Sequence, residues 1–182
     1  MQTQNRRHFI LPALAFLLVA GGCRGKHSRN VVQNEEPEEG GPRIASSLRM
    51  NDAAATVQLL RGFYGLESGT WRWTAGTFTV LLRPPLASPQ RGATLKFSFS
   101  IPDVLIQKLH TVALTASIAG TKLKTASYSK PGAYTLTADI PPELLAKEAI
   151  TVDFALDKSL PAGTLDQREL GLVATAVGLD SK

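Results

Sequence analysis

Apolar and polar residues alternate through most of the chain after residue 55, and this period of two constrains the fold more than any other feature. The clearest stretch is residues 95–101, where Leu, Phe, Phe and Ile alternate with Lys, Ser and Ser. Successive side chains of a strand point to opposite faces, so the pattern predicts a half-buried strand. The same pattern predicts seven further strands, over residues 56–64, 77–82, 112–118, 121–128, 134–140, 150–156 and 173–179.

Turn-forming residues separate the alternating segments. Ala119 and Gly120 join two of them so closely that a tight hairpin is expected. Only residues 103–109 and 142–147 are expected to be helical, each for a turn or two. About eight short strands, each with one apolar face, must pair two sheets face to face or close into a barrel. We therefore predict an all-β domain, a two-sheet antiparallel β-sandwich of jelly-roll-like form, with a small open barrel as the alternative.

The N-terminal segment has the layout of an export signal. Residues 9–20 form an apolar run of 12 residues, which is shorter than the roughly 20 that a membrane-spanning helix needs. The following Val-Ala-Gly-Gly-Cys at residues 19–23 resembles a bacterial lipobox. Residues 1–22 are therefore predicted to be a signal peptide, with diacylglycerol attached to Cys23 as the first residue of the mature protein.

The route of export stays open between two alternatives. Residues 6–10, Arg-Arg-His-Phe-Ile, resemble a twin-arginine signal, although Asn5 and Leu11 depart from the usual flanking residues. A basic start followed by an apolar run is equally typical of the general secretory route. Lipidation of Cys23 is expected in either case.

Residues 23–51 are predicted to be a disordered linker after the lipidated cysteine. Residues 35–42, Glu-Glu-Pro-Glu-Glu-Gly-Gly-Pro, combine like charges with helix- and strand-breaking residues, and they offer little apolar surface to bury. The acidic run could be a plain spacer or a docking segment for a basic partner. The expected location is the bacterial cell envelope, through the N-terminal lipid. Because Arg24 rather than Asp follows the cysteine, the outer membrane is favoured if the cell is Gram-negative.

Charge and composition exclude several classes of function for the β-sandwich domain, residues 52–182. The whole chain has a formal charge of +5, but from residue 51 onward 13 Lys and Arg face 11 Asp and Glu. This near-neutral balance argues against nucleic acid as a partner, which needs a dense basic patch. One cysteine and three histidines leave no internal disulfide and no Cys/His zinc cluster.

A search for catalytic motifs finds none. The chain contains no G-x-S-x-G, H-E-x-x-H or phosphate-binding glycine loop and no D-x-D-x-D-G calcium loop. His110 is the only histidine of the predicted domain, and no orienting partner adjoins it. We therefore predict a protein that is not an enzyme and has no cofactor or metal. A small glycan hydrolase that pairs two carboxylates of the domain is kept as the third hypothesis for function.

One block is rich in aromatic residues: Tyr64, Trp71, Arg72 and Trp73. On an extended strand Trp71 and Trp73 project to one face and Arg72 to the other. Indole rings can stack on the apolar C–H faces of sugars, while Arg and carboxylates bond sugar hydroxyls, so these four residues are candidate ligand contacts. The alternative is that one or both tryptophans pack on the core.

A second block, Asp166, Arg168 and Glu169, precedes the last strand. Opposite charges this close in sequence can form a charge-assisted network, and Gly171 after them permits a close backbone approach. The network could hold the loop against a neighbouring strand or contact a ligand.

The motifs Gly-Phe-Tyr-x-x-Glu at 62–67, Arg-Trp-Thr at 72–74 and Asp-x-Arg-x-Leu-Gly at 166–171 resemble β-sandwich accessory domains attached to bacterial glycosyltransferases and other polysaccharide-biosynthesis proteins. The resemblance implies a non-catalytic domain associated with carbohydrate. The leading hypothesis is thus an envelope lipoprotein that binds a glycan or an exported polysaccharide. The alternative is a structural or assembly lipoprotein that binds an envelope protein.

Overall fold

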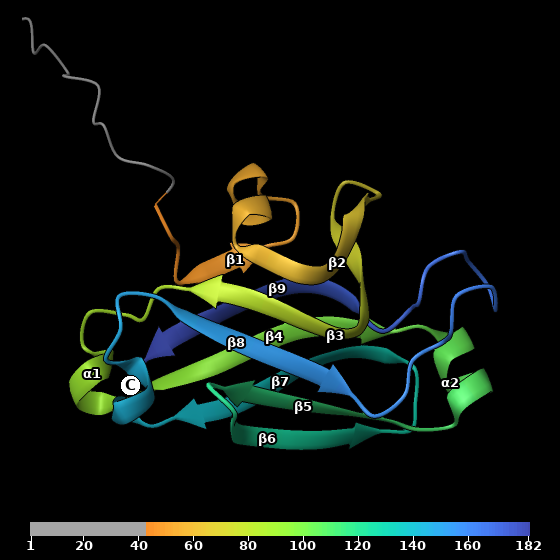
Figure 1. Ribbon diagram of the computed structural model, residues 1–182. Helices are drawn as coiled ribbons and strands as arrows, with labels where there is room; N and C mark the ends of the chain where they lie inside the picture. The colour runs from red at the N-terminus through yellow and green to blue at the C-terminus, as the bar shows by residue number, and fades with distance from the viewer. Residues whose placement is uncertain (1–42) are drawn as a thin grey trace, which may run out of the picture. The chain divides into compact units, whose positions relative to one another are not determined.

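Nine strands, all paired antiparallel, make up most of the described chain, which is residues 43–182 of the computed structural model (Figure 1). They are β1 (Ser47–Arg49), β2 (Leu59–Glu67), β3 (Trp71–Leu82), β4 (Ala93–Ile101), β5 (Val112–Ile118), β6 (Thr121–Tyr128), β7 (Gly132–Ile140), β8 (Ile150–Leu156) and β9 (Val173–Ser181). Short helical segments are η1 (Ala53–Val57), α1 (Ser88–Arg91), α2 (Asp103–Leu109) and η2 (Pro142–Leu145). The predicted all-β class is confirmed, with one strand more than expected.

The strands form two layers that share a link through β3. One layer has the order β1-β9-β4-β7, and the other has the order β2-β3-β8-β5-β6. The first residues of β3, Arg72 and Trp73, pair with β9, whereas residues from Thr77 onward pair with β8. With β2 set aside, this is the strand order of an eight-stranded jelly roll, so the predicted sandwich topology is confirmed.

The outer strands of the two layers, β6 and β7, approach each other without pairing. Lys124 Nζ donates a hydrogen bond to the Thr137 carbonyl at 2.9 Å, and the rings of Tyr128 and Tyr134 lie 4.6 Å apart. Among the described residues the strand pairings do not include a β6–β7 ladder. The molecule is therefore a sandwich whose edges nearly meet, rather than a closed barrel.

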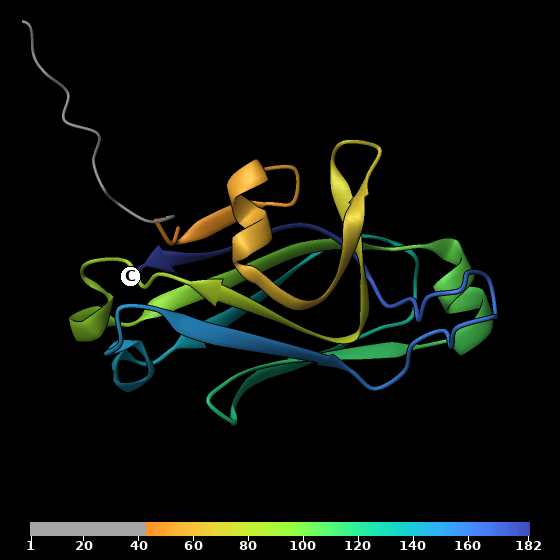
Figure 2. The same ribbon diagram turned by 45° about the horizontal axis from the view of Figure 1, so that its top comes forward.

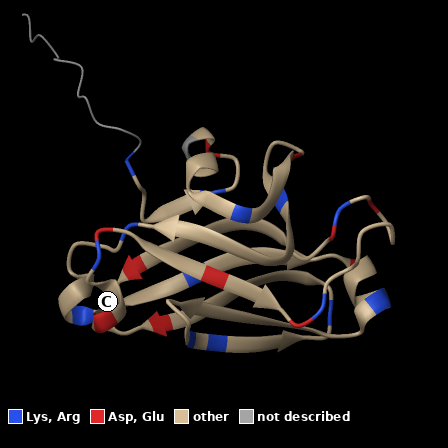
Figure 3. Ribbon diagram, viewed as in Figure 1, with Lys and Arg blue, Asp and Glu red and all other residues tan. Residues whose placement is uncertain are grey.

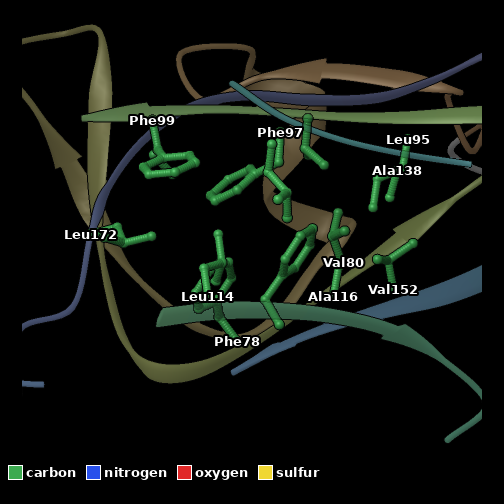
Figure 4. Packing of buried hydrophobic residues seen from close by; sticks show 14 of the residues in the cluster. Phe78, Val80, Leu95, Phe97, Phe99, Leu114, Ala116, Ala138, Val152 and Leu172 are labelled. Carbon is green, nitrogen blue, oxygen red and sulfur yellow. The ribbon is translucent and has the colours of Figure 1, made fainter. Parts of the chain in front are cut away.

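Phenylalanine side chains fill the space between the layers. The ring centroids of Phe97 on β4 and Phe154 on β8 lie 4.7 Å apart, and Phe78 on β3 stacks on Phe154 at 5.0 Å. Figure 4 shows Phe97 and Phe99 pointing from β4 toward Leu114 and Ala116 of β5. The side chains that alternate inward along the predicted strands are the buried ones, because both sheets bury only one face.

The predicted hairpin at Ala119 and Gly120 is present between β5 and β6. Both residues have positive φ, +48° and +80°, which a two-residue turn of this hand requires. Helix α2 covers the predicted residues 103–109, and it follows Pro102, whose backbone is extended. Within residues 43–182 no helix combines the length and apolar character needed to cross a bilayer.

Two expectations about the start of the domain are corrected. Residues 47–49 form β1 inside the segment predicted to be linker, because Leu48 and Met50 are buried and the strand pairs with β9. Thr56 and Val57, predicted to begin a strand, instead form the end of η1, and β2 begins at Leu59. The buried Gln58 amide then donates to the backbone carbonyls of Ala45 and Leu81, so the chain turns there before β2 begins.

The predicted signal peptide, the predicted lipidation site Cys23 and the predicted linker up to residue 42 lie outside the described residues. All described residues fall within one compact unit.

Candidate functional site

The hairpin of β2 and β3 is the most irregular pairing in the sandwich. Its register shifts three times between Leu59 and Leu66. Gly62 has φ +72°, and a Cβ there would lie 2.1 Å from the Thr77 carbonyl oxygen. Only glycine permits β2 to cross β3 at this distance. Beyond the crossing, the hairpin projects away from the two layers (Figure 2).

The two tryptophans lie on one face of β3, as the strand period predicts. Their ring centroids are 6.3 Å apart in an edge-to-face arrangement with an interplanar angle of 82°. Both side chains are half-buried, and Trp73 packs against the hydrophobic core. Glu67 is the register partner of Trp71 across the hairpin, so its side chain shares the tryptophan face. Trp73 thus combines core packing with partial exposure, and Trp71 adds a second indole beside it.

Arg72 lies on the other face of β3, where its side chain donates hydrogen bonds to backbone carbonyls. Its Nε donates to the Met50 carbonyl at 3.1 Å, and its Nη1 donates to the Tyr64 carbonyl at 3.0 Å. Its Nη2 lies 3.5 Å from the Thr56 hydroxyl. These bonds hold β2 and the segment after β1 against β3. The structure therefore separates Arg72 from the two tryptophans that flank it in sequence.

Arg168, from the loop before β9, pairs with Glu67, the register partner of Trp71. Its Nε and Nη2 donate to Asp166 Oδ2 at 3.1 and 2.6 Å, and its Nη1 donates to Glu67 Oε1 at 2.9 Å. The guanidinium carbon lies 5.0 Å from the centroid of the Tyr64 ring. We call Tyr64, Glu67, Asp166 and Arg168 the Arg168 cluster. It ties the loop before β9 to the projecting hairpin.

The charges of the Arg168 cluster stabilise one another. Hydrogen bonds from the Arg168 side chain, and then from its backbone, lower the pKa of Asp166 below its usual 3.8. The hydrogen bonds to Asp166 and Glu67 raise the pKa of Arg168. Such bonds to ionised groups are short and strong, and they fix the guanidinium plane.

Glu169 does not join this cluster. Its Oε1 accepts a hydrogen bond from the Ser159 hydroxyl at 2.5 Å, and a Cβ on Gly76 would lie 2.6 Å from that oxygen. Gly171 comes equally close, because a Cβ there would lie 2.6 Å from the Ala75 carbonyl oxygen. The close backbone approach expected at Gly171 is confirmed, and it packs the loop before β9 against β3.

Glu67 is the residue of the cluster that the sequence did not single out as a candidate site residue. It stands in the Gly-Phe-Tyr-x-x-Glu motif, but its partner Arg168 lies 101 residues away. No local pattern joins positions so distant, so the only available signal was the motif itself.

Two surface pockets of the described residues lie away from the tryptophans and from the Arg168 cluster. One of about 330 Å³ sits near the far end of β3, and Glu143 and Lys147 are its charged residues. Another, of about 290 Å³, lies over β4 and β7 beside Tyr134. Neither holds two carboxylates, as a glycan hydrolase would require. Among residues 43–182 no three His, Cys, Asp or Glu side chains gather as metal ligands.

Charged residues are spread over the described chain. Figure 3 shows Lys and Arg interspersed with Asp and Glu over both layers, without a stripe of one sign. The ion pairs Lys96–Asp180 and Arg61–Asp153 illustrate this mixing.

Comparison with known proteins yields likenesses of structure only. No protein-family model matches the chain, and no curated protein matches it. One similar solved structure is an acetyl xylan esterase, Est2A, from the rumen bacterium Butyrivibrio proteoclasticus, with 11% identity and a TM-score of 0.44, covering 77% of this chain and 33% of the esterase. Another comes from work on CBM4, with 15% identity and a TM-score of 0.31, covering 74% of this chain and 81% of that one. The chain thus spans about a third of the esterase's length, and at these TM-scores neither likeness assigns it a function.

Proposed function

We propose that this chain is a lipid-anchored lipoprotein of the bacterial cell envelope whose β-sandwich binds a glycan. The observation that carries the proposal is the pair of half-buried indoles, Trp71 and Trp73, on one face of β3 beside the Arg168 cluster. The projecting hairpin presents that face at the surface. A glycan, and not a small buried ligand, fits an open aromatic face of this kind.

The physical reason lies in the two kinds of surface that a sugar offers. The C–H groups of a pyranose ring form an apolar face, and the hydroxyls around it donate and accept hydrogen bonds. Trp71 supplies an apolar ring, and Glu67 and Arg168 supply an acceptor and a donor on the same side of the hairpin. A few placed polar groups beside apolar rings are typical of ligand sites.

The membrane anchor is the second part of the proposal. It rests on the lipobox-like residues 19–23 and on the single cysteine of the chain. The linker after Cys23 would hold the sandwich away from the bilayer, within reach of envelope polysaccharide. The outer membrane is the proposed location if the cell is Gram-negative.

Affinity electrophoresis of the full chain in gels containing envelope polysaccharides tests the glycan site. We expect retardation of the wild type and an affinity at least about tenfold lower in Trp71→Ala, the usual scale for truncating a tryptophan in a binding site. Leu86→Ala is the matched control, because Leu86 is 96% exposed and belongs to the segment between β3 and β4. If no envelope polysaccharide retards the wild type, glycan binding is refuted.

Metabolic labelling with an alkyne fatty acid tests the anchor. We expect label on the wild type and none on Cys23→Ser, together with release of the variant from the membrane fraction. Label that persists in Cys23→Ser would contradict lipidation at this residue.

A second candidate function, binding of an envelope protein, is favoured by one observation. Val57, Leu60 and Leu66 in η1 and β2 are 57%, 50% and 41% exposed, which is high for large apolar side chains. Cross-linking in cells from a photoreactive residue at position 60 would capture one protein reproducibly if this surface is an interface. A cross-linking pattern from position 60 that the added substitution Leu66→Ser leaves unchanged would count against it.

A further inference from the structure

The Arg168 guanidinium is paired with two carboxylates. Each of its three nitrogens donates to an oxygen of Asp166 or Glu67, and one face of its plane lies over the Tyr64 ring. Two carboxylates against one guanidinium leave the cluster with a formal charge of −1. An anion that approaches the tryptophan face therefore meets a cation already neutralised and an excess of negative charge.

Glu67 keeps one oxygen available on the tryptophan face. Its Oε1 accepts from Arg168, whereas within residues 43–182 no group donates to its Oε2. The side chain is 35% exposed. A carboxylate oxygen accepts strongly from a hydroxyl and repels a carboxylate, sulfate or phosphate.

The arginines of the hairpin do not offset this charge. Arg61 donates to the Thr79 hydroxyl and pairs with Asp153. Arg72 faces the other side of β3 and donates to backbone carbonyls. Lys158, in the loop before β9, directs its Nζ to the carbonyl oxygen of Thr111, 3.4 Å away.

We infer that the tryptophan face binds uncharged glycans and discriminates against acidic ones, with Glu67 as the residue that sets this specificity. The inference rests on the proposed glycan-binding function and adds the class of ligand. Glu67 Oε2 accepts a hydrogen bond from a hydroxyl of the sugar that stacks on Trp71. Arg168 positions Glu67 by holding its other oxygen.

Matched pairs of polymers test the class of ligand. Polygalacturonate, alginate and hyaluronan are each compared with their carboxyl-reduced forms, which keep the chain and lose the charge. Affinity electrophoresis of the full chain at low ionic strength should show tighter binding of at least one reduced form, by about tenfold over its acidic parent. Added salt should narrow this difference in affinity, because it screens the repulsion between the acidic polymer and the carboxylates of the Arg168 cluster.

The substitution Glu67→Gln tests the residue. The glutamine keeps a carbonyl that accepts from Arg168 but removes the charge, so discrimination between acidic and reduced polymers should shrink several-fold. Glu148→Gln is the control, since Glu148 is 88% exposed and pairs with Arg83, just beyond the other end of β3. Circular dichroism confirms that each variant is folded.

The outcomes separate this inference from the function on which it rests. Equal or tighter binding of the acidic polymers would overturn the inference and leave glycan binding standing. A change in discrimination no larger in Glu67→Gln than in Glu148→Gln would overturn the role of Glu67. If neither the polymer pairs nor any envelope polysaccharide is bound, the proposed function fails and the inference fails with it.

Discussion

The β4–β7 pair and the β2–β3 pair show two ways in which the same chain uses antiparallel strands. β4 pairs with β7 over nine successive residues, from Ala93 opposite Ile140 to Ile101 opposite Gly132, without a shift of register. β2 pairs with β3 through three shifts, and none of its side chains is fully buried. The regular pair gives one whole face to the core, whereas the irregular pair leaves its aromatic and charged side chains for other contacts.

The difference shows where the molecule can change without losing its fold. Bulged pairings re-aim side chains and interrupt the inside and outside alternation. In the β2–β3 hairpin they bring Tyr64 and Glu67 to Arg168. If β2 kept one register along β3, its side chains would alternate regularly between the two faces of the sheet, and one face would simply point to solvent.

Phe97→Ala should break the regular region and give the largest effect. Phe97 is fully buried, and its ring contacts those of Phe78, Phe99 and Phe154. We expect the free energy of unfolding to fall by about 3–5 kcal/mol, because the cavity cannot close completely. Urea denaturation followed by circular dichroism measures it.

Phe63→Ala is the counterpart in the irregular pair. Phe63 is partly buried and touches Phe78 edge-on at 5.2 Å. Phe63→Ala should therefore lower the free energy of unfolding clearly less than Phe97→Ala does. An equal or larger cost would mean that the hairpin carries as much of the core as β4 does.

Gly62→Ala should have the next largest effect on the free energy of unfolding, since Gly62 is where β2 crosses close to β3. The new Cβ would meet the Thr77 carbonyl and Phe78 in a backbone conformation that alanine rarely adopts. A loss of more than about 1 kcal/mol in the free energy of unfolding is expected. Gly65→Ala, with nothing within 4 Å of its new Cβ, should stay within about 0.5 kcal/mol of the wild type. Similar losses from both substitutions would show that β2 does not need the close crossing.

The smallest predicted effect is a change in acid sensitivity at the Arg168 cluster. The pKa of Asp166 is lowered from 3.8 by Arg168, so the carboxylate stabilises the folded state above that pH. This contribution is lost as the pH falls through the lowered pKa, because the unfolded chain then binds the proton more readily. Asp166→Asn should therefore flatten the fall in unfolding free energy between pH 5 and the acid limit.

Asp139→Asn serves as the comparison for this prediction. Asp139 is 76% exposed and pairs with Lys182, and exposed pairs of this kind contribute little. The free energy of unfolding of Asp139→Asn should fall with decreasing pH as it does in the wild type. If Asp166→Asn and Asp139→Asn give the same profile, the Arg168 cluster does not stabilise the fold.

The regular part of the fold was predictable because each of its strands carries its own signal. Residues 95–101 and 112–118 alternate without interruption, and α2 begins directly after a proline. β1 was missed because a strand of three residues is too short to show a period. Its pairing with β9 depends on a segment about 130 residues further along the chain, which local sequence does not describe.

The candidate site was predictable in its residue types and in the local pair of Asp166 and Arg168, but not in its contacts between distant segments. The shared face of Trp71 and Trp73 follows from the strand period alone. That Arg168 and not Arg72 lies beside Glu67 follows from the register shifts in β2 and from the docking of Gly171 on β3. Both are tertiary features, set by how close two backbones come.

The position of β9 has a consequence for the order in which the protein folds. β9 is the last described strand, yet it lies between β4 on one side and β1 and the start of β3 on the other. A chain that emerges N-terminus first therefore holds these strands without their common neighbour until residues 173–181 arrive. Because the pairs that close this layer are far apart in sequence, we expect assembly to be slow and to occur only after synthesis of β9.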